Sequence, residues 1–197
     1  MAIHNQIEEA KKELEKGGIV VFPTETAYGI AVDALNPDAV EKVYEVKQRP
    51  HEKGLTAIVD SLETAEKHAE LSEKEKKVIE KFMPGPLTLV TEKKDSIPDN
   101  LNEKFVFRIS SGEVASKLAK YGPITATSAN ISGEDTSYSV EDISEELLEK
   151  TDYILDLGNL EESPTSTIAE VNNGKLLIHR KGPIDRSEIE KVIKDDT

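Results

Sequence analysis

Two kinds of apolar pattern alternate along the chain. Short continuous apolar runs, which are typical of buried strands, occupy residues 19–22, 55–59, 87–91, 105–109, 124–126 and 153–157. Between them lie longer polar stretches in which apolar residues recur three and four positions apart, as in amphipathic helices. Because strands and helices intermix in this way, the pattern predicts an α/β fold.

Capping residues mark where these helices should begin. Asn5 with Glu8 and Ser72 with Glu75 have the spacing of a capping box, and Asn36-Pro37 reads as an N-cap followed by a first-turn proline. Further helices are expected from residue 61, around 114–118, from 139 and from 185, and Gly17 suits the C-terminal end of the first helix.

One turn signal makes the sheet mixed. Asn172-Asn173-Gly174 separates the apolar segments 168–171 and 175–179, and Asn and Gly tolerate the positive φ of a tight hairpin. The hairpin is antiparallel, whereas helical connections favour parallel strands. With 197 residues and no repeat or linker, we expect one α/β domain, residues 1–197, around a mixed parallel and antiparallel sheet.

Composition excludes several classes of protein. Cysteine is absent, which removes disulfides and thiolate chemistry, and no two of the four histidines have metal-ligand spacing. No apolar run has the length of about 20 residues that a membrane span requires, and the amino terminus is unlike a signal peptide, so a cytoplasmic protein is expected. The net charge of −14 disfavours non-specific binding of nucleic acid, although a local basic pocket is compatible with it.

Two hydroxyl-rich segments directly follow apolar runs. The first, within GGIVVFPTETAYGIAVDA, places Thr24, Glu25, Thr26 and Tyr28 after a buried strand, and the second covers residues 127–133. Such strand exits are where open α/β sheets bind ligands, although a solvated turn explains each segment equally well on its own. Neither standard nucleotide motif is present, but hydroxyls and free backbone N–H groups can cradle a polyphosphate.

Cations outside the acidic helices add to this picture. Lys47 and Arg49 could bind phosphate, or simply complement the dipole at a helix C-terminus. Arg108 lies within an apolar strand and therefore requires either a buried ion pair or a carboxylate-bearing ligand. Together with the hydroxyl-rich segments, these cations favour an anionic substrate that carries phosphate.

These residues match a known family. The chain resembles the YrdC-like threonylcarbamoyl-AMP synthases in their short form, through PTETAYG, KQRP, PGPLTLV, FRIS, PITATSANISG, PTSTIAEV and HRKGPI. The resemblance implies a twisted mixed sheet with a concave, positively charged face. It also implies an enzyme that joins L-threonine, bicarbonate or CO₂, and ATP into threonylcarbamoyl-AMP with release of pyrophosphate, for threonylcarbamoyladenosine modification of tRNA.

The resemblance also implies roles for individual residues. The L-threonine contacts fall on Thr26, Arg108, Ser166 and the backbone near Ala126, and the ATP contacts on Arg49, Lys53, Lys104, Ser128, Asn130, Thr136 and Arg180. Lys47 and Arg49 would act on the reacting phosphates, and Mg²⁺ would be carried by ATP. A histidine that many relatives use for threonine is replaced by Ile58.

Other functions stay open on sequence grounds. A relative that makes carbamoyl-AMP from carbamoyl phosphate, an RNA-binding or ribosome-maturation module, and a paralogous branch of the same family share much of the pattern. The partners implied are ATP, L-threonine, bicarbonate and a downstream threonylcarbamoyl-transferase complex, with tRNA as a direct ligand left open and no membrane.

Overall fold

The strands form two hydrogen-bonded sheets, which meet near the predicted site. A computed structural model describes residues 3–172 and 174–195. A four-stranded sheet has the order β8-β2-β1-β9, and a seven-stranded sheet has the order β11-β10-β5-β6-β3-β7 with β4 paired to β5. The strands are β1 Val20–Pro23, β2 Tyr28–Ala31, β3 Ala57–Val59, β4 Ala69–Glu70, β5 Leu87–Lys93, β6 Phe105–Ile109, β7 Ile124–Thr125, β8 Thr127–Ser128, β9 Tyr153–Ile154, β10 Thr167–Asn172 and β11 Lys175–Arg180.

The α/β class and the mixed pairing are confirmed. In the larger sheet β3 runs parallel to β6 and β10 parallel to β5, whereas β5 and β6 are antiparallel. The predicted hairpin is present as the antiparallel pair β10 and β11, while Asn173 in its turn lies outside the described residues. The sequence interpretation differs in placing all strands in a single sheet. The two-residue strand β8, Thr127–Ser128, has no apolar pattern, and the apolar pattern of β9 does not reveal that its partner is β1.

The opening strand does not lead into a helix. It turns back as an antiparallel hairpin in which Pro23 pairs with Tyr28 and Val20 with Ala31. The residues expected at a strand exit, 24–27, therefore form the turn of this hairpin. The second apolar run, 28–34, follows so closely that only a tight turn can join the two strands.

The chain changes sheets at Ala126. Just before it, β7 pairs with β3 of the larger sheet, and just after it, β8 pairs with β2 of the smaller sheet. Ser128 thereby lies opposite Gly29 in the ladder. This crossing brings the two hydroxyl-rich segments of the sequence side by side.

The helices begin largely where capping residues predict. They are α1 Ile3–Glu15, α2 Pro37–Lys47, α3 Leu62–His68, α4 Glu73–Phe82, α5 Glu113–Ala119, α6 Glu145–Glu149 and α7 Arg186–Lys194, with short 3-10 turns His51–Lys53 and Val140–Asp142. The Asn36 side chain accepts hydrogen bonds from the amides of Asp38 and Ala39, and Ser72 forms the predicted capping box with Glu75. There are two exceptions. Asn5 lies inside α1, which already begins at Ile3, and Ser139 precedes only a 3-10 turn, because α6 begins later, at Glu145.

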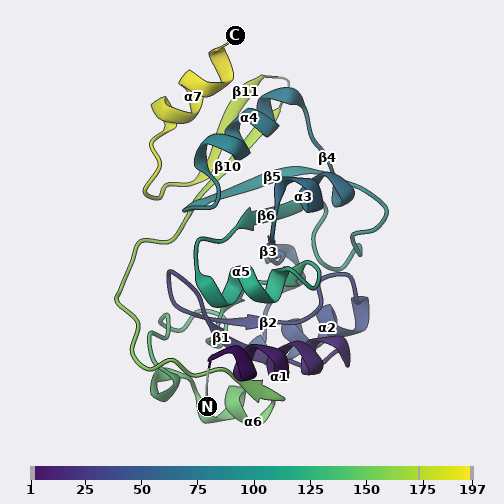
Figure 1. Ribbon diagram of the computed structural model, residues 1–197, viewed down its shortest axis with the longest axis vertical. Coiled ribbons are helices and arrows are strands. Elements are labelled where there is room, and N and C mark those ends of the chain that lie inside the picture. Colours follow the sequence, from purple (N-terminus) through teal and green to yellow (C-terminus); the bar gives the residue numbers. More distant parts are fainter. Residues whose placement is uncertain (1–2, 173, 196–197) are drawn as a thin grey trace.

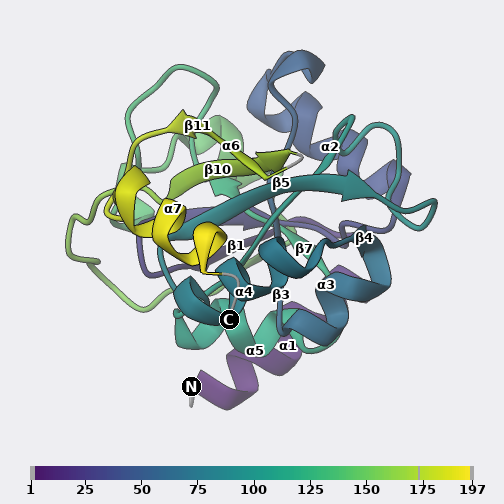
Figure 2. The same ribbon diagram turned by 90° about the horizontal axis from the view of Figure 1, so that it is seen from above.

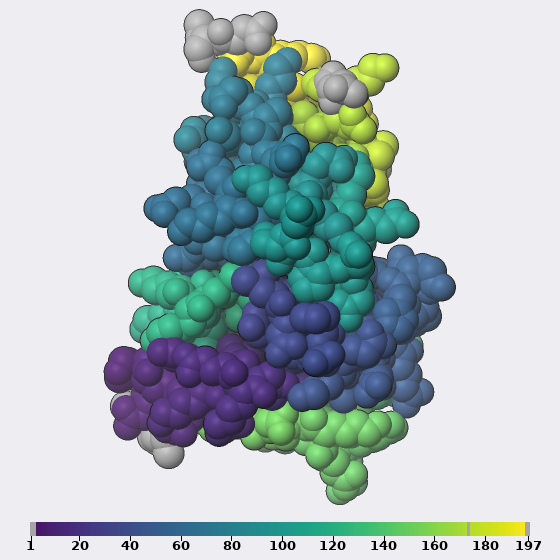
Figure 3. Space-filling view, turned by 90° about the vertical axis from the view of Figure 1, so that its right-hand side faces the viewer, coloured from purple at the N-terminus to yellow at the C-terminus, as the bar shows by residue number. Residues whose placement is uncertain are grey.

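Helices pack on both faces of the strands, with α1 and α5 in one apolar cluster and α2, α4 and α6 in the other. Figure 2 shows α1 and α5 gathered on one side, where apolar residues such as Val20, Phe22 and Ile58 pack with Val114 and Leu118 of α5. The hairpin β10–β11 and α7 close one end of the molecule, and α1 lies at the other (Figure 3).

A long extended segment joins the two ends. Residues 155–166 run without regular structure from β9 in the small sheet to β10 in the large one, along the left edge of Figure 1. Within the described residues, no helix is long and apolar enough to cross a membrane.

Candidate active site

A cavity of about 290 Å³ opens where the two sheets meet. Its walls come from the hairpin turn after β1, the crossing at Ala126, Thr88 of β5 and Arg108 of β6, and the end of the 155–166 segment. The lining residues are Thr24, Thr26, Ala27, Tyr28, Gly29, Arg49, Thr56, Thr88, Arg108, Ala126, Thr127, Ser128, Thr136, Tyr138, Ser163, Thr165, Ser166 and Arg180.

The cavity gathers most of the residues that sequence reasoning placed in a site. Thr26, Arg49, Arg108, Ala126, Ser128, Thr136, Ser166 and Arg180 all line it, although as many as 154 positions separate the first from the last. Lys47, Lys53, Lys104 and Asn130 do not. The lining also contains three arginines and no carboxylate, so an anion is the ligand that it suits.

The hairpin turn is built by its own hydroxyls. Thr24 Oγ1 donates to the carbonyl of Ala27 (2.7 Å) and accepts from the amides of Thr26 (3.1 Å) and Ala27 (3.2 Å). Thr26 Oγ1 lies 3.0 Å from Thr24 Oγ1 and also lines the cavity. Thr24 therefore shapes the turn, and Thr26 is presented to the ligand.

Arg108 is the most buried of the three arginines that line the cavity. It is only 6 % exposed, and its Nη1 donates to Glu25 Oε1 in an ion pair. Burial lowers the pKa of Arg108, while the charge of Glu25 opposes that shift. The sequence left a choice between a buried ion pair and a carboxylate ligand for this arginine. The ion pair is present, and Arg108 still reaches the cavity.

Arg180 enters the cavity from the end of β11 and is held by Ser166. Its Nε donates to the carbonyl of Ser166 and its Nη2 to Ser166 Oγ, both at 3.0 Å. Ser166 Oγ is in turn 2.8 Å from Thr88 Oγ1, a buried hydroxyl in the apolar run of β5. Burial, and secondarily the charge of Arg108, lower the pKa of Arg180. The two guanidinium groups therefore lie close enough in the cavity for their charges to interact.

Arg49 is held in the same manner, by carbonyls rather than carboxylates. Its Nε donates to Gly54 O (2.9 Å) and its Nη2 to Lys53 O (3.0 Å), both in the turn that follows α2. No described carboxylate pairs with Arg49. Its charge is thus available to phosphate.

Lys47 lies beneath the cavity, not in it. It is 1 % exposed, and its Nζ donates to the carbonyls of Ser128 and Asn130 (2.7 Å) and to Asn130 Oδ1 (3.1 Å). Burial, with a smaller contribution from the charge of Arg49, lowers the pKa of Lys47 to about 7. The expected direct action of Lys47 on the phosphates therefore gives way to a positioning role, in which it shapes the loop after β8.

Asn130 belongs to the same buried arrangement. Its side chain is close to Lys47 and to Ser128 Oγ, and its Nδ2 donates to Glu134 O (2.6 Å). Lys53 lies nearby but is exposed, with its Nζ 3.4 Å from Ser132 Oγ at the outer side of this loop.

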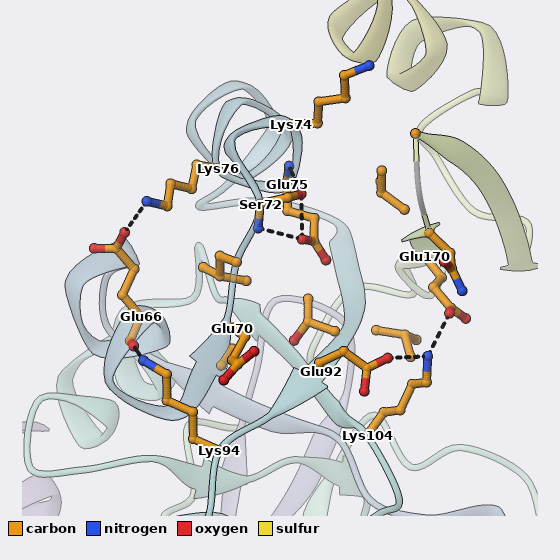
Figure 4. A pocket seen from close by; sticks show the side chains of 17 residues that line it. Glu66, Glu70, Ser72, Lys74, Glu75, Lys76, Glu92, Lys94, Lys104 and Glu170 are labelled. Atoms are coloured by element: carbon orange, nitrogen blue, oxygen red, sulfur yellow. Dashed lines mark hydrogen bonds and ion pairs between the residues drawn. The ribbon is translucent and has the colours of Figure 1, made fainter.

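Lys104 lies in a different cavity. A larger space of about 700 Å³ opens beside α4, β4 and the β10–β11 hairpin. There Lys104 Nζ pairs with Glu92 (2.8 Å) and Glu170 (2.9 Å), as Figure 4 shows. Its position before β6 and outside the family motifs explains why the expected ATP contact is not reproduced by this geometry.

The donors of the lined cavity do not form a metal cage. Its polar groups are hydroxyls, guanidinium groups and backbone atoms, and the described residues contain no group of three or more His, Cys, Asp or Glu suited to a metal. A hard cation prefers several oxygen ligands with negative charge. The described residues of this cavity therefore offer no set of ligands for such a cation.

The geometry agrees with a sequence match over most of the chain. The sequence profile of the family that comprises Sua5, YciO and YrdC, described as telomere recombination, matches residues 12–182. The chain belongs to this family. A Methanocaldococcus jannaschii protein provisionally named threonylcarbamoyl-AMP synthase is 40 % identical over 179 residues, which cover 90 % of this chain and 86 % of that protein.

Solved structures from the family share the fold. Sua5 of Pyrococcus abyssi, crystallised with L-threonine, has a TM-score of 0.88 at 34 % identity over 95 % of this chain and 57 % of its own. Escherichia coli YciO has a TM-score of 0.81 at 21 % identity, over 92 % of this chain and 91 % of its own. The chain therefore spans little more than half the length of the P. abyssi protein.

Several residues of the site were not singled out from the sequence. Thr88, Ser163 and Tyr138 line the cavity, and only Thr88 carries a signal, as a hydroxyl inside the apolar run LTLV. Ile58, at which the resemblance put a side-chain contact to threonine in doubt, lies opposite Arg108 in the ladder but is fully buried. It does not line the cavity.

Proposed function

We propose that this protein is an L-threonylcarbamoyl-AMP synthase and thus a nucleotidyltransferase. It would join L-threonine, bicarbonate or CO₂, and ATP, release pyrophosphate, and supply the adenylate for threonylcarbamoyladenosine modification of tRNA. The observation that carries the proposal is the convergence of Arg49, Arg108 and Arg180 on one hydroxyl-lined cavity without a lining carboxylate. Family membership and relatives of that name support it.

The residues divide into two groups by position. Arg108, Thr26 in the hairpin turn and Ser166 would bind the amino acid. Among them, the guanidinium group of Arg108 matches the carboxylate. Arg49, Arg180 and the hydroxyls of Ser128 and Thr136 would bind ATP. Lys53 at the outer side of the loop would add charge near the phosphates, and Lys47 and Asn130 would shape the loop.

The reaction needs positioning more than a protein nucleophile. The threonine amine, once it has lost a proton to solvent, attacks CO₂ to form a carbamate. A carbamate oxygen then attacks the α-phosphorus of ATP, and the bond from that phosphorus to the bridging oxygen of the leaving pyrophosphate breaks. Arg49 and Arg180 would stabilise the charge that develops on the phosphates, which is the main catalytic term in phosphoryl-type transfers.

Magnesium enters this proposal as part of the Mg–ATP substrate. The cavity offers no carboxylate cage for the ion, so the phosphates would carry it in. We expect EDTA to abolish turnover and excess Mg²⁺ to restore it.

The partners follow from the chemistry of the product. Threonylcarbamoyl-AMP is a reactive mixed anhydride, so a transferase complex would have to consume it quickly. The net charge of −14 does not favour a stable complex with free tRNA.

Isotope labelling tests the proposal. The protein is incubated with Mg–ATP, L-threonine and ¹³C-bicarbonate, and the adenylate is analysed by mass. A threonylcarbamoyl-AMP that carries one ¹³C is expected. An adenylate that forms only when carbamoyl phosphate replaces threonine and bicarbonate would contradict the proposal and favour a carbamoyl-AMP-forming enzyme.

A further inference from the structure

Glu25 stands directly behind the arginine that would bind the amino acid. It belongs to the hairpin turn after β1 but is not among the residues that line the cavity. Its Oε1 accepts from Arg108 Nη1, and its Oε2 accepts from Ser110 Oγ. Both carboxylate oxygens are therefore engaged, and the side chain is only 19 % exposed.

Further contacts hold Glu25 in place. Ser163 Oγ donates to the Glu25 carbonyl (2.9 Å), which ties the turn to the 155–166 segment. Gly112 approaches so closely that a Cβ there would lie 3.0 Å from Glu25 Oε2 and 3.1 Å from its backbone nitrogen. The carboxylate thus occupies a built pocket and is not a mobile surface group.

The ion pair leaves part of Arg108 free. A guanidinium group has five N–H donors in one plane. Among the described residues, only Glu25 accepts a hydrogen bond from Arg108, and it does so at Nη1. The Nε and Nη2 donors, which together can bind a carboxylate in a bidentate manner, remain for a ligand of the cavity that Arg108 lines.

We propose that Glu25 is a positioning residue for substrate recognition, which orients Arg108 so that its Nε and Nη2 edge receives the α-carboxylate of the amino acid. The inference rests on the proposed function, since it concerns the amino-acid half of the same site. Glu25 itself touches neither substrate nor reacting atoms.

A competing role for Glu25 is less consistent with these contacts. If the substrate displaced Glu25 from Arg108, the carboxylate would stay buried with Ser110 as its remaining side-chain donor, which is costly for a charge. If Glu25 stays, its carboxylate keeps both of its donors, and the Nε and Nη2 donors of Arg108 are still available to the substrate.

Calorimetry with two ligands tests this inference. L-threonine and L-threoninamide, which lacks the carboxylate, are titrated into the wild type and Glu25→Gln. Because the variant no longer holds the guanidinium edge in place, we expect threonine to bind about tenfold or more weakly, while threoninamide changes less than about threefold. The ratio of the affinity for L-threonine to that for L-threoninamide, which measures the preference for the carboxylate, should therefore fall. The affinity for ATP should change little.

Conservative and matched variants complete the test. Glu25→Asp should recover part of the preference, and Glu113→Gln, which removes an exposed carboxylate paired with Lys117, should leave it unchanged. Equal loss of both ligands in Glu25→Gln would reduce Glu25 to a structural residue, and tighter threonine binding would identify it as a competitor. Either result overturns the inference.

The test remains decisive if Glu25→Gln fails to fold. Ser110→Ala removes one anchor and keeps the ion pair, and we expect a smaller but selective weakening of threonine binding, about threefold. No change would overturn the inference. Binding does not require turnover, so a wild type that binds threonine but forms no adenylate would contradict only the proposed function. A wild type that binds neither ligand would overturn both.

Discussion

At the scale of single residues, two of the three arginines in the cavity are oriented by uncharged groups. Arg49 and Arg180 are oriented by backbone carbonyls and a serine hydroxyl, so their positive charge is not cancelled by a neighbour. Arg108 alone is balanced by a carboxylate. In the proposed function, this difference separates a region for phosphate from a region for the amino acid.

The first prediction concerns Arg49. Arg49→Ala should lower kcat by about 10² to 10³, because a preorganised charge on the reacting phosphates is lost, while the melting temperature stays close to that of the wild type. Pyrophosphate release and thermal unfolding measure the two effects. Arg186→Ala, which removes an exposed arginine paired with Glu190, is the matched control. Unchanged turnover in Arg49→Ala would remove this residue from the site.

The second prediction concerns the buried Lys47. Lys47→Met leaves three oxygen acceptors without their donor, and the free energy of unfolding should fall by about 2–4 kcal/mol. Urea unfolding measures the change. Lys117→Met, at an exposed i,i+4 pair, should leave the unfolding free energy almost unchanged.

The pH dependence of this effect has a definite sign. The pKa of Lys47 is lowered from its ordinary value of 10.5 to about 7 in the folded protein, so between these values the unfolded chain binds more protons than the folded one. Stability then rises with pH. The advantage of the wild type over Lys47→Met should therefore be larger at pH 9 than at pH 6. A smaller advantage at pH 9 would contradict the burial of this lysine.

Residues of the candidate site could be predicted from the sequence where a polar side chain stood out against apolar neighbours. Arg108 in an apolar strand and the hydroxyls after apolar runs signalled the site. The burial of Lys47 was not predictable, because the sequence does not reveal which cation of the KQR stretch points into the loop and which points into the cavity. Glu25 looked like any acidic turn residue, since only the fold brings Ser110 and Arg108 to it.

At the scale of elements, the site is held together by an extended segment. Tyr28 is fully buried, and its hydroxyl donates to Gly158 O (2.8 Å), has Asp156 Oδ1 at 3.0 Å, and accepts from the amide of Leu157 (3.0 Å). This hydroxyl ties the 155–166 segment to β2. The segment in turn presents Ser166 to the cavity.

The third prediction concerns this tie. Tyr28→Phe should lower the free energy of unfolding by about 1 kcal/mol, because the amide of Leu157 and the carbonyl of Gly158 lose their partner. It should also accelerate amide hydrogen exchange in residues 156–166 more than elsewhere. Tyr121→Phe, at an exposed tyrosine, is the control. Uniform exchange along the chain would contradict the role of Tyr28 as an anchor of the segment.

The fourth prediction concerns the turn after β11. A Cβ at Gly182 would lie 2.4 Å from the Thr167 nitrogen and 2.5 Å from the Thr165 carbonyl oxygen. Gly182→Ala should therefore displace the backbone that carries Ser166, cost about 1–3 kcal/mol of stability and weaken ATP binding through Arg180. Lys181→Ala next to it is the control. A variant with unchanged stability would mean that the turn relaxes without effect on the site.

Helices and strands were predicted correctly where the capping residues were clear and the apolar runs were long. The capping box of α4, the hairpin β10–β11 and the last helix were foreseen, whereas α1 begins at Ile3, three residues before the start that an N-cap at Asn5 implies. The hairpin β1–β2 and the change of sheets at Ala126 were not foreseen. Both depend on non-local pairing, which local pattern does not encode.

At the scale of the whole molecule, an acidic protein encloses a basic cavity. The net charge is −14, yet the lining of the site contains three arginines and no acidic residue. The acidic exterior disfavours polyanions, while the cavity attracts a small anion such as a nucleotide. The α/β class, the mixed pairing and the family could be predicted from the sequence. The division into two sheets that meet at the site required the structure.

The measurement that tests the central claim most directly is pyrophosphate release from Mg–ATP, with L-threonine and bicarbonate each present or omitted. The account predicts release that requires both, and a loss of that release in Arg49→Ala. Release that is independent of threonine, or that appears only with carbamoyl phosphate, would contradict it.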